Sequence, residues 1–268
     1  MSGGWDCHAH LFGPYARFPL AADRSYTPPE ATEAAYLALL QRLGLDHGVL
    51  VHPSAYGDDL RLLFHALDTY TQLRGVVVLR QDTPLDLASL RARGVRALRF
   101  SHRSAAGANF AGSASLDDLV ALAPRLADAG LHAELWTDHQ ALPHIAGTLR
   151  ALPVPVVIDH MGGFDVNAGV DEPGFKALVS LVEAGRAWVK LCVYRNLLTA
   201  PDLEQGRPFH QALLQAHPER LLWGSDWPHL RVVPEPDAAD LLALFKAWTG
   251  SESLVQQVLQ TNPTALYA

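Results

Sequence analysis

The chain has 268 residues, of which 49% are hydrophobic and 18% charged, so it is neither a disordered nor a fibrous sequence and can build a substantial core. Its net charge of −7 argues against nucleic acid as a partner. No stretch reaches the roughly 18 apolar residues of a membrane span, and the start "MSGGWDCHAH" lacks a secretory signal. The two cysteines, Cys7 and Cys192, stand far apart in apolar segments, so we expect reduced thiols and a cytoplasmic location.

Short apolar strands alternate with helical segments along the chain. Helical spacing is clear at 28–44 and 116–130, which end in glycines typical of helix C-caps. Because parallel neighbours need a crossover, the alternation predicts a parallel sheet. Eight units predict a single α/β domain over 1–268, a (β/α)8 TIM barrel. A doubly wound sheet is the alternative, but no G-x-G-x-x-G follows the first strand. The predicted strands are 5–11, 47–53, 74–79, 95–100, 131–136, 155–160, 187–194 and 220–226.

Polar residues interrupt these strands at their C-terminal ends, where barrel enzymes carry their chemistry. They are His8, His10, His52, Ser54, Arg99, Arg103, His160, Arg195, Asp226 and His229. Side chains alternate along a strand, so we expect His8 and His10 to share an inward face and Cys7 to face the helices. Two imidazoles on one inward face are costly to bury without a role. A lone histidine such as His52 or His229 is more often structural.

The carboxylate and the arginines at these ends indicate a functional site. Asp226, between two tryptophans, is either a turn cap or a base; we favour a base that takes a proton from water. Arg195 stands at the end of the apolar strand "VKLCVYRN". Its planar guanidinium could bind a carboxylate of a ligand, and we favour this over an ordinary salt bridge within the protein. Asp6 and Asp159 are expected to orient neighbouring groups.

The stretches "DCHAHLFGP", "HPSAYGDD", "VRALRF", "IDHMGG", "CVYRN" and "WGSDWPH" together resemble the amidohydrolase superfamily. The likeness is greatest to its lactonase branch, typified by 2-pyrone-4,6-dicarboxylate lactonase, and runs through nearly the whole chain. The resemblance implies a (β/α)8 barrel that hydrolyses a lactone without a divalent metal. It also implies that Asp226 activates water while His8, His10 and His160 surround the lactone carbonyl oxygen. The implied carboxylate contacts are Arg99, Arg103, Arg195, Ser54 and Tyr26, the last in a candidate lid loop at 15–29.

Zinc remains an alternative, held by His8, His10 and Asp226. Metal-dependent relatives supply a further ligand from the fourth or fifth strand. Trp136 stands near that place, where an indole cannot ligate zinc, and we expect it to contact substrate instead. Glu134 and His139 are conceivable substitutes. We expect no required cofactor, although three protein ligands could suffice for a catalytic zinc.

Other readings of the same residues differ in substrate or in reaction. They are a sugar-acid or muconolactone-type lactonase, a zinc-dependent amidohydrolase or decarboxylase, and a non-enzymatic barrel that binds an organic acid. Sugar lactones would need more neutral hydrogen-bond donors and fewer arginines. A candidate base beside an oxyanion cluster argues against mere binding. The expected partner is a small anionic lactone, with the protein a monomer or small homo-oligomer.

Overall fold

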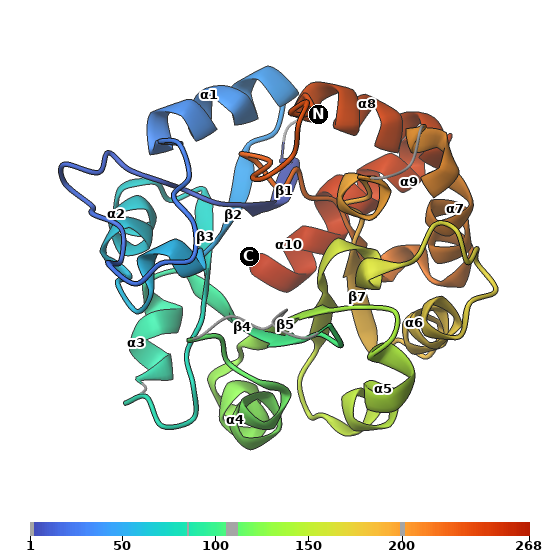
Figure 1. Ribbon diagram of the computed structural model, residues 1–268, viewed down its shortest axis with the longest axis horizontal. Coiled ribbons are helices and arrows are strands. Elements are labelled where there is room, and N and C mark those ends of the chain that lie inside the picture. The colour runs from blue at the N-terminus through green and yellow to red at the C-terminus, as the bar shows by residue number, and fades with distance from the viewer. Residues whose placement is uncertain (1–2, 85, 106–111, 199–201) are drawn as a thin grey trace.

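The computed structural model describes residues 3–84, 86–105, 112–198 and 202–268. Eight parallel strands bond to one another in chain order, and helices surround them (Figure 1). The predicted TIM barrel is therefore confirmed. The strands are β1 (Trp5–Ala9), β2 (His47–Val51), β3 (Leu73–Val77), β4 (Val95–His102), β5 (His132–Thr137), β6 (Val156–Ile158), β7 (Ala187–Lys190) and β8 (Leu221–Leu222).

The crossover helices begin and end where the sequence supplies caps. The side chain of Thr32 caps α1, and Gly44 ends it in the left-handed region. Ser115 and Asp118 form a capping box at the start of α4. The helices are α1 (Glu33–Leu43), α2 (Arg61–Thr69), α3 (Leu87–Ala92), α4 (Leu116–Ala129), α5 (Leu142–Ala151), α6 (Pro173–Glu183), α7 (Arg207–Ala216), α8 (Ala238–Thr249), α9 (Glu252–Gln256) and α10 (Asn262–Tyr267). Among the described residues, no helix has the length and hydrophobicity needed to cross a membrane.

Several strands end earlier than the apolar pattern predicts. β7 stops at Lys190, and Arg195 lies in the following 3-10 turn η3 (Tyr194–Leu197). β6 stops at Ile158, so His160 lies in the turn η2 (Asp159–Gly163). Irregular backbone at the mouth of the barrel therefore carries much of the predicted site.

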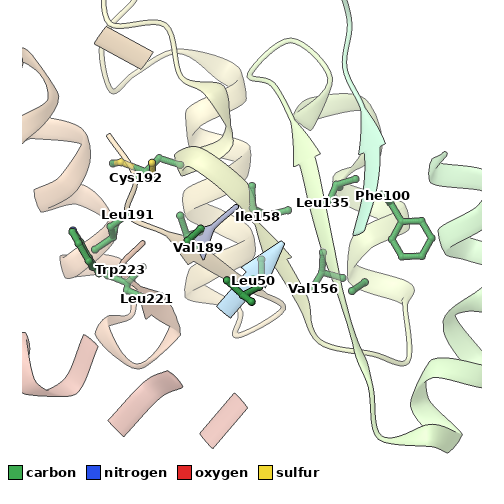
Figure 2. Close-up of a cluster of buried hydrophobic side chains, with 14 of the residues drawn as sticks. Leu50, Phe100, Leu135, Val156, Ile158, Val189, Leu191, Cys192, Leu221 and Trp223 are labelled. Atoms are coloured by element: carbon green, nitrogen blue, oxygen red, sulfur yellow. The ribbon is translucent and has the colours of Figure 1, made fainter. Parts of the chain in front are cut away.

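Two apolar clusters hold the barrel together. The larger packs the outer face of the strands against the helices and includes Leu50, Leu135, Ile158 and Val189 (Figure 2). The smaller fills the interior with residues that alternate with these, such as Val157. Cys7 belongs to the interior cluster, so the prediction that it faces the helices is wrong.

The last helix, α10, closes the N-terminal end of the barrel; in Figure 1 it lies across the centre of the ring. Its Tyr267 stacks on Trp5 with ring centroids 6.1 Å apart. The backbone carbonyl of Tyr267 accepts hydrogen bonds of 3.0 Å from the Nε atoms of Arg74 and Arg96. The opposite end stays open for the site.

Candidate active site

A register shift in β1 brings both of its histidines to the site. Asp6 pairs with Gly48 and Ala9 with Leu50, so three steps on β1 match two on β2. Such a bulge re-aims side chains. It lets His8 point inward as Cys7 does, which strict alternation would forbid. Asp6 then fixes the neighbouring chain by accepting hydrogen bonds from the Ser225 backbone at 2.8 Å and its hydroxyl at 2.6 Å.

Asp226 lies at the floor of the mouth, just past β8. Its backbone N–H donates to His8 O at 2.8 Å, and its φ of 57° is left-handed, a strained conformation for a non-glycine residue. The carboxylate is buried. Its Oδ2 accepts from Tyr194 Oη at 2.7 Å and from Arg195 Nε, while Oδ1 lies 3.4 Å from His10 Nε2 and 3.6 Å from His8 Nε2. One oxygen is thus held by the protein and the other faces the histidines.

The charge next to Asp226 keeps it ionised. Burial by itself would raise the pKa of this carboxyl, but the positive charge of Arg195, more than any other neighbour, holds its pKa well below the usual range. Burial lowers the pKa of His8 to about 4 and that of His160 well below its usual value. A carboxylate and two neutral imidazoles therefore meet here at neutral pH.

His160 reaches the site through a strained turn. It has a φ of 49° and is followed by two more left-handed residues, Met161 and Gly162. Its backbone carbonyl accepts a 2.8 Å hydrogen bond from Asn196 Nδ2, which ties the turn to η3. The His160 ring centroid lies 4.9 Å from that of His8, and its buried Nδ1 has no hydrogen-bond partner among the described residues.

The arginines predicted to hold carboxylates lie at the same mouth, but two of them already pair with aspartates. Arg99 Nε donates to Asp159 Oδ2 at 2.8 Å, and Arg195 Nε to Asp226. Arg103 lies with its guanidinium 4.3 Å from the centroid of the Trp136 ring. Nε carries the contact in both ion pairs, Arg195 Nη1 also lies 3.4 Å from the carbonyl oxygen of Leu230, and both arginines line the cavity.

An open cavity lies above Asp226, with about 150 Å³ accessible to the centre of a water molecule. That is room for a small ring compound. Eight of the predicted residues line it, and His8 and Arg103 are not among its lining residues. The eight are His10, Tyr26, Ser54, Arg99, Trp136, His160, Arg195 and Asp226.

Among the cavity residues that the sequence did not predict, Arg231 is the cationic one. It lines the rim with its guanidinium 4.6 Å from the ring centroid of Tyr26, so it joins the loop after β8 to the candidate lid loop. Its position in the loop that follows the last strand could have identified it, because such loops form the active sites of these barrels. His52 and His229 are each held by a backbone carbonyl: His52 Nε2 lies 2.8 Å from Gly57 O and His229 Nε2 lies 3.1 Å from Ser225 O. His52 also lines the cavity.

A fully buried ionic network lies beneath the histidines. Lys190 Nζ is 2.5 Å from Glu134 Oε2, 3.3 Å from Asp159 Oδ1 and 3.2 Å from His8 Nδ1. Glu134 Oε1 accepts from Tyr267 Oη at 2.7 Å. Glu134 is thus committed to this network and does not serve as the substitute metal ligand that the sequence allowed.

His139 is also excluded as a metal ligand, because its Nδ1 lies 3.2 Å from Glu172 Oε1, away from the cavity. A divalent cation at His8, His10 and Asp226 would find the right ligand atoms, which lie within 4.8 Å of one another. The surrounding charge does not fit it. Three cations (Lys190, Arg99, Arg195) already balance three carboxylates (Glu134, Asp159, Asp226), so a buried dication would be uncompensated.

Comparisons of the sequence and of the structure with known proteins agree on one family. The model of the Amidohydrolase family matches residues 5–268. A 4-sulfomuconolactone hydrolase of Rhizobium radiobacter is 34% identical over 99% of this chain and 90% of its own length. A 2-pyrone-4,6-dicarboxylate hydrolase of Comamonas testosteroni is 32% identical over the same shares. A solved Pseudomonas putida structure, described as a 2-pyrone-4,6-dicarboxylic acid hydrolase, has 34% identity and a TM-score of 0.83 over 99% of this chain and 97% of its own. This chain therefore belongs to the amidohydrolase family of enzymes.

Proposed function

We propose that the protein hydrolyses a small anionic lactone, such as 2-pyrone-4,6-dicarboxylate, with water activated by Asp226 and without a divalent metal. One observation carries the proposal: Asp226 Oδ1 and the Nε2 atoms of His8 and His10 converge within 3.6 Å beside a cavity lined by arginines. The relatives named above, which are lactone hydrolases by name, support the reaction class.

Asp226 acts first, as the general base. The attacking water donates one proton toward Asp226 Oδ1 and the other toward His10 Nε2, whose ring is held by a 2.8 Å contact between Nδ1 and Val51 O. As the water oxygen bonds to the lactone carbonyl carbon, its proton passes to the carboxylate. Arg195 and Tyr194 keep the other oxygen in place, so the base loses little orientation during the transfer.

The histidine rings then stabilise the tetrahedral intermediate. The proposed donors to the developing oxyanion are the ring N–H groups of His160, which lines the cavity, and of His8, whose Nε2 lies 3.6 Å from Asp226 Oδ1. In a buried site such donors are worth more than in water. The carbonyl carbon–ring oxygen bond breaks as the oxyanion collapses. Asp226 returns its proton to the leaving oxygen, which gives the open-chain acid and the free carboxylate base.

The anionic groups of the substrate bind at the arginines. Arg99 and Arg195 present their remaining guanidinium nitrogens to the cavity, and planar forks suit carboxylates. Trp136 provides a flat wall under Arg99, whose guanidinium lies 5.1 Å from the ring centroid. Ser54 and Tyr26 line the opposite rim and add hydroxyl donors.

A muconolactone bearing a sulfonate is a second candidate substrate. The 34% identity to a 4-sulfomuconolactone hydrolase favours it as much as the 32% identity favours the pyrone. Arginine binds sulfonate and carboxylate oxygens by the same charge-assisted hydrogen bonds, so the cavity residues suit both.

The test uses protein treated with chelator and dialysed. Loss of pyrone ultraviolet absorbance on mixing with 2-pyrone-4,6-dicarboxylate reports hydrolysis, and 4-sulfomuconolactone is assayed in parallel. We expect turnover of one of them to persist after chelation. Asp226→Asn should lower kcat by on the order of 10²- to 10⁴-fold, the usual contribution of a positioned general base.

Two results would contradict the proposal. If activity disappeared with chelator and returned with zinc, the result would indicate a catalytic zinc ion bound by His8, His10 and Asp226. Full activity in Asp226→Asn would rule out Asp226 as the base. Because Asn also removes one charge of the buried pair with Arg195, a thermal melt establishes that the variant is folded before its kcat is compared.

A further inference from the structure

The ammonium of Lys190 is among the most deeply buried charges of the described protein. Lys190 ends β7 and is 0% exposed, beneath the catalytic floor and away from the cavity lining. Lysine is almost never fully buried unless it is paired. The proposed hydrolysis assigns it no step, so its place needs another explanation.

The ammonium has three close polar partners, two of which are carboxylates. Nζ donates to Glu134 Oε2 at 2.5 Å and lies 3.3 Å from Asp159 Oδ1 and 3.2 Å from His8 Nδ1. Burial would lower the pKa of Lys190, but the two carboxylates raise it, so the group stays charged. An ammonium can only donate. The nitrogen of His8 that faces it must therefore accept.

We propose that Lys190 is a positioning residue that fixes His8 as the Nε2–H tautomer. A neutral imidazole carries one ring proton, and the hydrogen bond at one nitrogen decides where that proton sits. With Nδ1 accepting from Lys190, the proton is on Nε2, which lies 3.6 Å from Asp226 Oδ1 at the floor of the cavity. His8 thus offers a donor to the attacking water and to the oxyanion.

The opposite tautomer is close at hand, which makes the choice consequential. Asp159 Oδ1 lies 3.4 Å from the same Nδ1 and would accept its proton if Lys190 were absent. His8 would then present a lone pair at Nε2, next to the acceptor Asp226. The Nε2 atom would stop serving as a donor and become a metal ligand atom.

His10 provides the internal contrast. Its Nδ1 faces the carbonyl of Val51 at 2.8 Å, so in the neutral ring the proton sits on Nδ1 and Nε2 carries the lone pair. Metal-binding histidines usually have this arrangement, with the second nitrogen donating to a carbonyl or carboxylate. His8 cannot adopt that arrangement, because its Nδ1 accepts a hydrogen bond from Lys190 and so carries no proton. The two histidines therefore differ in role, one donor and one acceptor, although they stand two residues apart.

The decisive measurement is the tautomer of His8 in the protein, read from multiple-bond ¹H–¹⁵N correlation spectra of ¹⁵N-histidine-labelled samples. His8→Gln removes and so assigns the signal. The variant pair is Lys190→Met/Glu134→Gln, which deletes the cation with its nearest carboxylate, and Glu134→Gln alone, which keeps Lys190. Circular dichroism and thermal melts establish that both fold.

We expect Nε2–H in the wild type and in Glu134→Gln, and Nδ1–H in the double variant. Calorimetric titration with zinc chloride should show about 10- to 100-fold tighter binding by the double variant than by Glu134→Gln, the range that outer hydrogen-bond partners of metal ligands typically control. With a lactone that the wild type hydrolyses, the kcat of the double variant should be on the order of 100-fold lower than that of Glu134→Gln, with little change in KM. Loss of one donor to the oxyanion has an effect of this size.

An Nδ1–H wild type overturns the inference, whether or not the double variant folds. So does a folded double variant that keeps Nε2–H. The kinetic consequence rests on the proposed function, but the tautomer does not. Wild-type protein with His8 as Nε2–H that opens no lactone would refute the proposed reaction and leave the role of Lys190 intact.

Discussion

Replacing Arg195 with alanine should damage the catalytic base as well as substrate binding. The sequence suggested that Arg195 holds a carboxylate of the substrate, and the loss of such a contact alone would mainly raise KM. In the structure, the Nε of Arg195 donates to Oδ2 of Asp226, a carboxylate that is 1% exposed. Removing one partner of a buried ion pair costs about 3–5 kcal/mol because the other charge stays buried. Arg195 is itself about a quarter exposed, so the lower end applies.

A loss of about 3 kcal/mol should lower the melting temperature by roughly 6–12 °C for a domain of this size. Misorientation of the base should reduce kcat by on the order of 10²-fold. Loss of a charge-assisted hydrogen bond to the substrate should raise KM by at least about 10-fold. Scanning fluorimetry and steady-state kinetics on chelated protein measure all three.

Arg231→Ala is the matched control, because Arg231 lines the same cavity but stacks on Tyr26 and does not bond the base. Its melting temperature should equal that of the wild type. If Arg195→Ala raised only KM and left kcat and melting temperature unchanged, the ion pair would not hold Asp226 and the simpler clamp would be correct.

Two further predictions concern the rim and the fold. Arg231→Ala should raise KM for a doubly anionic lactone roughly two- to fivefold, since an exposed charge contributes up to about 1 kcal/mol, and should leave KM for a singly charged lactone unchanged in the same assay. Burial lowers the pKa of His210 to about 4 from 6.5, so its neutral form stabilises the fold above pH 6.5, and that stability is lost as pH falls toward 4. At pH 5 the expected loss of unfolding free energy is about 2 kcal/mol. In urea unfolding, His210→Phe should therefore lose about that much less unfolding free energy between pH 7 and pH 5 than the wild type does. An equal loss in both proteins would contradict the assignment.

The fold could be predicted because its signals are local. Helix α4 shows its start in Ser115 and its end in Gly130, and the predicted span 116–130 differs from the structure by one residue. Eight strand–helix units then leave few topologies. The predicted catalytic residues meet because the C-terminal ends of parallel strands all lie at one end of a barrel. This prediction does not depend on the exact boundaries of the strands.

Strand ends and side-chain directions were harder to predict. Period-two alternation placed Cys7 opposite His8, but a register shift in β1 turns both inward. Such shifts depend on pairing with the neighbouring strand, which a single sequence does not reveal. Lys190 did show a signal, because it alternates with apolar Val189 and Leu191 and so must point into the barrel. Its partner Glu134 lies 56 positions away, so only the folded barrel brings them together.

The order of charges along the barrel axis explains how an acidic protein can bind an acidic substrate. Lys190 beneath the cavity and Arg99 at its lining are matched by Glu134 and Asp159, so these four charges cancel. Because long-range charge is screened over about 10 Å at moderate salt, the net charge of −7 matters less at the mouth than the nearest guanidinium groups. An anion arriving there meets arginines whose inner nitrogens are already anchored by aspartates. The aspartates hold these guanidinium groups at the cavity before the anion arrives, and such preorganisation is the condition under which hydrogen bonds contribute most to catalysis.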